Sequence, residues 1–337
     1  MTTKGDGADR SIRAEGLRRR FGKLDAVDGV DLDVPGGQIF GFLGPNGAGK
    51  STSVKILTTI LNATAGNATV AGYDVQRQGG KVREAIGVAL QDVGLDPLMT
   101  ARELLVLQGE LFGTPRDEAR KTAERLLKTV GLDDVDPKKR AGAYSGGMKR
   151  RLDLALALVH DPRILFLDEP TTGLDPASRA AIWEEVRRLN DELGMTIFLT
   201  TQYLEEADRL ADQIAIINKG RIVASGTPDE LKRQVGDEVV ELQFGSREDA
   251  GRAYDALAPV APNRQAAERE LRLYFGRAAE NVPELVRALD GAGVRLQGMT
   301  IEQPSLDDVF LRVTGEALEH EVDEAAADVP EVAEARS

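Results

Sequence analysis

The segment GPNGAGKS, residues 44–51, limits what this chain can fold into more than any other part of its sequence. It fits the pattern G-x-x-x-x-G-K-[ST]. It lies between the apolar run IFGFL (39–43) and a stretch whose apolar residues recur at helical spacing (51–61). Glycines let backbone N–H groups converge on phosphate oxygens, and the N-terminus of the following helix adds a favourable dipole. The segment therefore predicts a phosphate-binding loop between a buried strand and a helix.

Two side chains of this loop carry most of its expected chemistry. Lys50 can reach the β- and γ-phosphates of a nucleotide, and the hydroxyl of Ser51 can bind Mg²⁺. The loop residues that we expect to contact ATP are Gly44, Pro45, Asn46, Gly47, Ala48, Gly49, Lys50, Ser51 and Thr52. The alternative, a glycine-rich turn that only precedes a helix, explains the complete spacing and both flanks less well.

A second motif, ILFLDEP (164–170), places two carboxylates directly after an apolar run. In an open parallel sheet such a strand delivers both acids to the carboxyl edge, beside the phosphate loop. Asp168 would hold Mg²⁺, directly or through water, and Glu169 would orient and deprotonate the water that attacks a phosphate. An acidic turn that simply ends a strand is the alternative, and the phosphate loop in the same chain disfavours it.

The alternation of apolar runs with helical stretches predicts a parallel sheet that is buried on both faces. The apolar runs are IFGFL (39–43), GVALQ (87–91), ILFL (164–167) and TIFLTT (196–201). The segment QIAIINKGRIVAS (213–225) is typical of a hairpin that turns at Lys219 and Gly220. Residues from about 92 to 160 lack strand signals, which indicates an inserted helical subdomain.

The pattern changes after Gly236, where EVVELQF and later ELRLYF show the alternation of half-buried strands. We expect Asn281 and Pro283 to open one helix, and Ser305 to open a short last helix that ends at Gly315. These signals predict a small α+β domain.

Length and charge limit the classes of function. The chain has 337 residues, enough for about two domains. Its formal net charge is −13, and residues 316–337 hold eight acidic residues against one basic residue. We expect this segment to be a disordered acidic tail. An acidic chain lacks the basic face that phosphate backbones require, so no nucleic-acid partner is expected.

Cysteine and histidine usage excludes several chemistries. The sequence has no cysteine, which removes disulfide scaffolds, thiolate metal sites and thiol catalysis, and it has only two histidines, His160 and His320. It has neither an apolar leader in its first residues nor an apolar run near the roughly 20 residues that a membrane span needs. We therefore expect a cytoplasmic protein.

A third motif, YSGGMK (144–149), gives the chain a family resemblance. The chain is similar to the ATP-binding cassette (ABC) ATPases, whose signature loop begins Leu-Ser-Gly-Gly-Gln. The resemblance covers about residues 12–226, with every motif in order. It implies an α/β fold: a P-loop NTPase (RecA-like) core with an antiparallel β subdomain and an inserted helical subdomain. The small C-terminal α+β domain would follow this core.

The resemblance also implies roles for residues outside the first two motifs. Ser145, Gly146 and Gly147 would contact the γ-phosphate of ATP held by the other protomer of a dimer. Phe21 would stack on adenine, with a core phenylalanine as the alternative. Gln91 would touch Mg²⁺ or water and sense a membrane partner, with a polar strand end as the alternative. The loop that couples the two ATP sites across the dimer is Gly173-Leu174-Asp175, so Asp175 is included among the ATP-site residues.

One position departs from the family pattern. A histidine usually follows the threonine pair of the switch region, but in TTQYLEEAD (200–208) the residue is Gln202. A glutamine amide can still donate a hydrogen bond to phosphate, but it cannot carry the charge of an imidazolium. We expect ATP binding to survive and hydrolysis to be slow. A glutamine that only caps a helix is the alternative.

Three longer segments, two of which extend motifs already named, resemble the daunorubicin/doxorubicin-resistance type of exporter ATPase. They are YSGGMKRRLDLALAL, TTQYLEEADRLADQIAIINKGRIVASG and SLDDVFLRVTG. This resemblance implies an ATPase that forms a homodimer on the inner face of the cell membrane. It would energise the efflux of a hydrophobic drug or antibiotic through a separate permease, which we expect to dock at the helical region near Gln91. The alternatives are a soluble non-transport cassette ATPase, a low-turnover regulatory module and an importer subunit.

The expected organisation has four parts. They are a flexible N-terminus (1–11), a nucleotide-binding domain (12–236), a C-terminal regulatory or dimer-stabilising domain (237–315) and the acidic tail (316–337). The SLDDVF string (305–310) also fits a capped amphipathic helix with a purely structural role.

Overall fold

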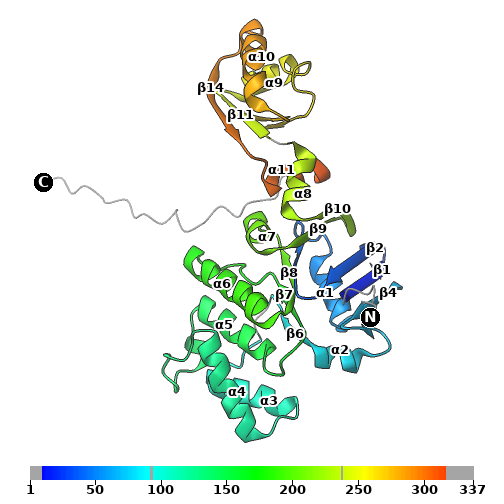
Figure 1. Ribbon diagram of the computed structural model, residues 1–337, viewed down its shortest axis with the longest axis vertical. Coiled ribbons are helices and arrows are strands. Elements are labelled where there is room, and N and C mark those ends of the chain that lie inside the picture. The colour runs from blue at the N-terminus through cyan, green and yellow to red at the C-terminus, as the bar shows by residue number, and fades with distance from the viewer. Residues whose placement is uncertain (1–9, 92–93, 237, 316–337) are drawn as a thin grey trace, which may run out of the picture.

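The computed structural model describes residues 10–91, 94–236 and 238–315 (Figure 1). Most of the predicted flexible N-terminus and all of the predicted acidic tail lie outside the described residues. The strands are β1 (Arg10–Phe21), β2 (Leu24–Pro35), β3 (Ile39–Leu43), β4 (Ala65–Val70), β5 (Tyr73–Asp74), β6 (Ile86–Ala89), β7 (Ile164–Asp168), β8 (Thr196–Thr201), β9 (Gln213–Asn218), β10 (Arg221–Gly226), β11 (Glu238–Phe244), β12 (Arg264–Ala267), β13 (Glu270–Phe275) and β14 (Leu296–Glu302). The helices are α1 (Lys50–Leu57), α2 (Gly79–Ala85), α3 (Ala101–Leu111), α4 (Arg116–Thr129), α5 (Gly146–Ala157), α6 (Pro176–Leu193), α7 (Leu204–Leu210), α8 (Pro228–Val235), α9 (Arg247–Ala256), α10 (Ala278–Gly291) and α11 (Leu306–Thr314), with a 3-10 turn at Ala141–Ala143.

The central sheet has the strand order β10-β9-β3-β8-β7-β6, and all neighbouring strands in it are parallel except β9 and β10. Every residue of β3, β7 and β8 is buried. The register places Phe198 opposite both Phe40 and Phe166, with ring centroids 5.5 and 5.4 Å apart. The sheet is therefore parallel and covered on both faces, as the apolar runs predicted.

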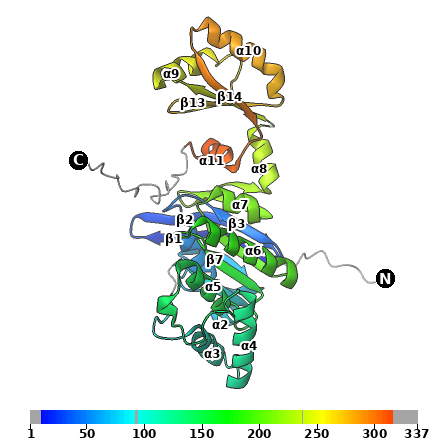
Figure 2. The ribbon, with the colours of Figure 1, turned by 90° about the vertical axis from the view of Figure 1, so that its left-hand side faces the viewer.

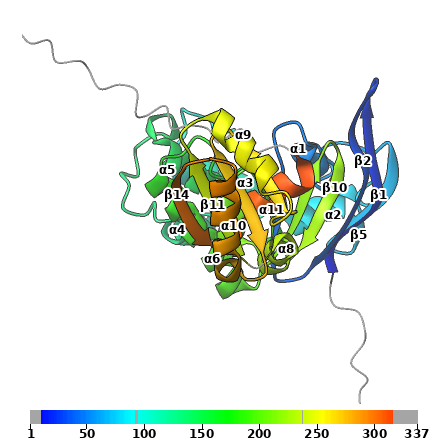
Figure 3. The ribbon, with the colours of Figure 1, turned by 90° about the horizontal axis from the view of Figure 1, so that it is seen from above.

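Different elements cover the two faces of this sheet. One face packs against α1, α2 and the antiparallel sheet β2-β1-β4-β5, and the other packs against α3, α4, α5 and α6. Figure 3 shows the antiparallel sheet and the helices α4 and α5 on opposite sides of the molecule. The described residues from 94 to 160 contain three helices and only an isolated bridge in place of strands, in agreement with the predicted helical insertion.

The hairpin of β9 and β10 turns where the sequence predicted. Lys219 and Gly220 have φ angles of 48° and 79°, so both lie in the left-handed region that two-residue hairpin turns of type I′ require.

Residues 238–302 form a separate sheet of order β12-β13-β11-β14, with α9 and α10 packed on one face. The chain order β-α-β-β-α-β with antiparallel pairing is the ferredoxin-like arrangement. Along β11, Val240, Leu242 and Phe244 point to the helices, as the alternation predicted. Figure 2 shows the two helices on the side away from the rest of the molecule.

The start of α10 differs from the expectation. The helix begins at Ala278, so Asn281 and Pro283 lie inside it instead of opening it. Two alanines, strong helix formers, extend it by about one turn toward the N-terminus. Pro283 is the sixth residue of this helix, and its missing N–H removes the intrahelical bond that would reach the carbonyl of Ala279. The side-chain amide of Asn281 donates to the carbonyl of Arg277 (2.8 Å).

Helix α11 joins the C-terminal sheet to the body of the molecule, as Figures 1 and 2 show. Ser305 caps it in a capping box with Asp308, and Gly315 ends it in the left-handed conformation, as the sequence predicted. Its apolar side chains pack against α7 and α8, in one cluster with Leu204 and Ala207 of α7. The guanidinium of Arg312 donates to two carbonyls at the end of α8, both at 2.8 Å.

Candidate nucleotide-binding site

The candidate site is a cavity of about 420 Å³ at the carboxyl edge of the central sheet. Parallel strands deliver their following loops to this edge, and the loops after β3, β6 and β7 all reach the cavity. The lining residues are Phe21, Leu24, Ala26, Pro45, Asn46, Gly47, Gly49, Lys50, Ser51, Thr52, Gln91 and Glu169. All of these except Leu24 and Ala26 are predicted site residues. The sequence carries no signal for those two beyond their place at the start of β2.

The phosphate loop needs glycine at two positions for steric reasons. Gly49, the N-cap of α1, has a φ of 110°, and a Cβ there would approach the carbonyl oxygen of Ala26 to 2.4 Å. Gly44 does not line the cavity, because it packs against β9, where a Cβ would lie 2.3 Å from the Ile217 carbonyl oxygen. Ala48 is buried behind the loop, and its carbonyl accepts a bond from the Gly220 N–H (2.9 Å).

Lys50 is held at the centre of the site. Its Nζ donates to the carbonyl oxygens of Gly44 (2.7 Å) and Pro45 (3.2 Å) and lies 3.1 Å from Oε1 of Glu169. The side chains of Lys50 and Glu169 are only 4% and 5% exposed. In such surroundings the charges interact more strongly than in water.

Asp168 connects the phosphate loop to the strand β8. Its Oδ1 accepts hydrogen bonds from the hydroxyl of Ser51 (3.1 Å) and from that of Thr200 (2.5 Å). Asp168 therefore does not line the cavity itself but contacts the side chain that we expect to bind Mg²⁺. Thr200 belongs to the switch segment but is not among the predicted site residues.

Glu169 has a strained backbone. Its φ is 49°, in the left-handed region that non-glycine residues rarely adopt. The N–H of Glu169 lies 3.1 Å from both the carbonyl oxygen and the hydroxyl oxygen of Thr200. Strain of this kind persists only where the surrounding structure holds it, and it concentrates at functional sites.

Phe21 and Gln91 lie at the rim of the cavity. The ring of Phe21 is 46% exposed, and the guanidinium of Arg19 stacks on it at 4.5 Å from the centroid. Gln91 is exposed and lies two residues after the last residue of β6. The phenylalanine is therefore not a core residue, which disfavours the alternative that we considered for it.

The signature residues lie away from the cavity. Ser145 caps α5 and accepts a hydrogen bond from the Met148 N–H (3.3 Å). Gly147 faces the start of α6, where a Cβ would lie 2.7 Å from Oγ of Ser178. Asp175 caps α6 and accepts bonds from the N–H and hydroxyl of Ser178 (2.9 and 2.6 Å). The structure thus brings Gly147 and the Asp175 cap together, but not with the phosphate loop of the same chain.

The switch residue Gln202 and the histidine His160 also lie outside the lining of the nucleotide cavity. Gln202 is half-buried directly after β8, at the same edge of the sheet as Glu169, but it is not among the residues that line the cavity. His160 stacks on Phe112 with ring centroids 3.9 Å apart, and its Nε2 lies 2.9 Å from the carbonyl of Ile86. It therefore contacts the helical subdomain and not the nucleotide cavity. His320 lies outside the described residues.

The fold and the site together define an ABC ATPase. The ABC transporter family profile matches residues 27–172. A profile described as the C-terminal domain of DrrA1-3-like ATP-binding proteins matches residues 226–314. Among solved structures, the cassette cbiO1 from Clostridium perfringens aligns with a TM-score of 0.61 and 29% identity, over 67% of this chain and 94% of that one. A dimeric cassette in a post-hydrolysis state, bound to ADP and phosphate, aligns with a TM-score of 0.58 and 26% identity, over 64% of this chain and 98% of that one.

Several relatives align with almost the full length of this chain, and they identify its subgroup within the ABC ATPases. The daunorubicin resistance ATP-binding protein DrrA2 of Streptomyces coeruleorubidus is 45% identical, over 94% of this chain and 99% of its own. The daunorubicin/doxorubicin resistance protein DrrA of Streptomyces peucetius is 42% identical, over 96% and 98%. The linearmycin resistance protein LnrL of Bacillus subtilis is 36% identical, over 91% and 99%. The chain belongs to the family of ABC transporter ATP-binding proteins of the drug-resistance type, and it is an ATP-binding ATPase subunit.

Among the residues that the structure describes, no helix combines the length and the apolar character needed to cross a membrane.

Proposed function

We propose that this ATPase works as a homodimer on the inner face of the cell membrane and drives the export of a hydrophobic drug or antibiotic through a separate permease. The observation that supports the ATPase activity is that Lys50, Ser51 and Glu169 line one cavity, with Asp168 bonded to Ser51 directly behind it. The names of its relatives support the class of cargo, because they are resistance proteins for daunorubicin, doxorubicin and linearmycin.

In this proposal Glu169 is the general base. It accepts a proton from a water molecule while the water oxygen forms a bond to the γ-phosphorus. The bond from that phosphorus to the β–γ bridging oxygen breaks, and its electron pair leaves with ADP. Lys50 now pairs with Glu169, and the phosphates of ATP compete for this cation. Nucleotide binding would therefore release the carboxylate for the water.

The oxygen donors around Ser51 fit Mg²⁺, which binds in proteins through one or two carboxylates together with substrate phosphates. Ser51 and Asp168 are already in hydrogen-bond contact, and Gln91 lines the same cavity. When bound, Mg²⁺ supplies positive charge against the negative charge of the phosphate oxygens. The residues that would hold it are Ser51, Asp168 and Gln91.

A second copy of the chain completes the site in this proposal. Ser145, Gly146 and Gly147 lie outside the cavity of their own chain, while a helix N-terminus with a serine cap suits a phosphate. The dimeric cassette among the structural neighbours supports such an assembly. Each ATP would then lie between the phosphate loop of one protomer and the signature of the other, with Asp175 at the boundary.

The helical subdomain offers a surface for the permease. Leu107, Leu111 and Phe112 are exposed at the end of α3. Beside them lies a cavity of about 460 Å³, lined by Gln108, Phe112 and His160 among others. Exposed apolar patches of this kind mark protein interaction sites. The patch supports docking of the permease near Gln91, and it would hold the subunit at the membrane.

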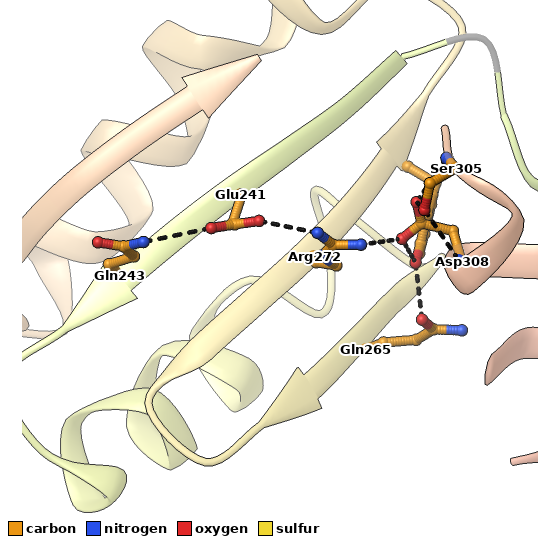
Figure 4. Close-up of polar contacts among 7 residues, drawn as sticks. Glu241, Gln243, Gln265, Arg272, Ser305 and Asp308 are labelled. Carbon is orange, nitrogen blue, oxygen red and sulfur yellow. Dashed lines mark hydrogen bonds and ion pairs between the residues drawn. The ribbon is translucent and has the colours of Figure 1, made fainter. Parts of the chain in front are cut away.

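We also propose a regulatory or dimer-stabilising role for residues 237–315. Figure 4 shows how this unit is anchored: Arg272 bridges Glu241 and Asp308, and Asp308 reaches Ser305 at the start of α11. Because α11 also packs against α7, a shift of the C-terminal sheet would reach the helix that follows Gln202.

The proposal is tested with Glu169→Gln, which keeps the shape of the side chain but cannot accept the proton. We expect phosphate release to fall about 100-fold or more. ATP binding should survive, and ATP-bound dimers should accumulate in size-exclusion chromatography. The matched control is Glu205→Gln, an exposed carboxylate of α7 outside the cavity, which should keep normal turnover. Unchanged phosphate release in Glu169→Gln would show that Glu169 is not the base.

A further inference from the structure

Arg150 is a buried cation that none of the predicted roles uses. It lies on α5, one turn after the signature Ser145–Gly147, and only 5% of it is exposed. Its guanidinium donates to the carbonyl oxygens of Pro170 (2.8 Å), Asp168 (3.1 Å) and Leu90 (2.5 Å). It also contacts the carboxylate of Asp153 at 3.1 Å. One side chain therefore joins three separate segments of the chain.

The carbonyls that Arg150 contacts lie next to site residues. Asp168 and Pro170 flank Glu169 on both sides, and Leu90 directly precedes Gln91. Two arginine bonds thus bracket the residue whose φ is 49°. On the opposite side, Thr200 bonds the N–H of Glu169. The strained backbone of Glu169 is consequently fixed from two directions, by the helix α5 and by the strand β8.

A merely structural role accounts poorly for this arrangement. Taking a guanidinium out of water costs free energy, and buried ion pairs often contribute little net stability. Here the three carbonyls and Asp153 satisfy the buried donors of Arg150, and two of those carbonyls belong to the residues on either side of Glu169. The planar fork of arginine can reach these carbonyls at the same time, which a lysine ammonium cannot do in the same geometry.

We propose that Arg150 is the positioning residue for Glu169, and that it transmits the position of the signature helix to the base of the same protomer. In a dimer, the signature of this helix would bind the nucleotide of the partner. The state of one ATP site would then set the geometry of the base in the other. This inference rests on the proposed function of Glu169.

The test compares Arg150→Gln and Arg150→Lys with Arg151→Gln. Arg151 is the matched control, because it is the next residue of α5 and also donates to carbonyls, those of Val130 and Gly131 in the helical subdomain. We expect Arg150→Gln to lower kcat about tenfold to hundredfold, as the loss of charge-assisted hydrogen bonds would do, with KM for ATP within about twofold. Arg150→Lys should recover part of the loss, and Arg151→Gln should stay within about twofold of wild type in kcat.

A second measurement separates positioning from general damage. If Arg150 acts through Glu169, single-turnover hydrolysis by the double variant Arg150→Gln/Glu169→Gln should be no slower than by Glu169→Gln alone. Losses that multiply in the double variant would overturn the inference, as would a folded Arg150→Gln protein with wild-type kcat. If Arg150→Gln does not fold, the test uses Arg150→Lys instead. A wild-type kcat in Arg150→Lys would then overturn the inference.

These outcomes are distinguishable from failure of the proposed function. If Glu169→Gln alone keeps its hydrolysis, the assignment of the base is wrong and the inference on Arg150 falls with it. If Glu169→Gln loses hydrolysis while both folded Arg150 variants keep it, only the inference on Arg150 is wrong.

Discussion

The ion pair of Lys50 and Glu169 and the ion pair of Arg272 and Asp308 both withdraw a carboxylate from water, but different structures hold them. Glu169 lies in a loop with a φ of 49°, and its partner Lys50 is shared with two loop carbonyls. Asp308 lies in the first turn of a helix and accepts bonds from the N–H and hydroxyl of Ser305, both at 2.8 Å. The nucleotide site thus contains a residue with a strained backbone and a partner that can be exchanged, whereas Asp308 lies in regular helical backbone within a capping box.

The surroundings of Asp308 explain its charge. Burial alone raises the pKa of a carboxyl, but the bonds from Ser305 and Tyr274 and the charge of Arg272 together lower the pKa of Asp308 below its usual value. The hydroxyl of Tyr274 donates to it at 2.8 Å, and Arg272 lies at 2.7 Å. A network in which each member has a partner stabilises a unique arrangement. We therefore expect the pair Arg272–Asp308 to contribute to stability and the pair Lys50–Glu169 to contribute to catalysis.

The largest expected effect comes from Asp308→Ala. The change leaves Arg272 and Tyr274 without their shared acceptor, so the free energy of unfolding of the C-terminal unit should fall by about 3–5 kcal/mol. Urea unfolding followed by circular dichroism measures it, and fluorescence of Trp183, the single tryptophan, reports on the body separately. The control is Glu284→Ala on the exposed face of α10. A loss below about 1 kcal/mol would remove the contrast between the two pairs.

A second prediction concerns Asp153, the partner of Arg150 near the nucleotide site. Burial raises the pKa of Asp153 to about 6, and the charge of Arg150 opposes this only in part. The folded protein therefore holds this proton more tightly than the unfolded chain does. The resulting stability is fully present below about pH 4 and is lost as the pH rises through about 6.

Asp153→Asn mimics the protonated form at every pH. We expect it to unfold with a free energy about 3 kcal/mol higher than wild type at pH 8, and with the same value near pH 4. Denaturant unfolding at several pH values measures the difference. Asp161→Asn, which removes a carboxylate that is 79% exposed, should show no such pH dependence. A variant that is less stable than wild type at pH 8 would show that the Arg150 contact outweighs the cost of burial.

The switch position provides a smaller effect on catalysis. Gln202→Ala removes a donor that we expect to reach the γ-phosphate, and kcat should fall about tenfold while ATP still binds. Gln202→His should raise kcat, because an imidazolium adds positive charge at this position. Steady-state phosphate release measures both, with Gln243→Ala in the C-terminal sheet as the control. Unchanged turnover in both variants would leave Gln202 with no catalytic role.

The sequence predicted those features that depend on local pattern. The phosphate loop is a contiguous motif, the buried strands are contiguous apolar runs, and the cap at Ser305 with its end at Gly315 follows from neighbouring residues. Parallel strands then bring the loops to one edge by topology alone. Most of the cavity lining could be named for this reason.

The sequence could not predict contacts between distant segments. Arg150 stands in the run KRR on a helix, and nothing local distinguishes it from Arg151, although Arg150 is buried against the residues that flank Glu169 and Arg151 is not. The bond from Thr200 to Asp168 joins residues 32 positions apart. The pairing of Lys50 with Glu169 likewise depends on how two loops meet. These are tertiary contacts, which leave no periodicity or spacing in the sequence.

The smallest expected effect is that of removing residues 316–337. This segment carries eight acidic residues and one basic residue, while every site residue lies upstream of it. Both ion pairs compared above are complete within the described residues, so neither should need it. A chain that ends after Gly315 is therefore expected to keep its kcat and its unfolding free energy.

Removal of α11 as well, by ending the chain after Gln303, is the contrasting variant, because it deletes Asp308 and the contacts of Phe310 with α7 and α8. A large loss of activity on removing 316–337 alone would assign that segment a part in folding or dimerisation, and it would extend the stabilising region beyond the junction.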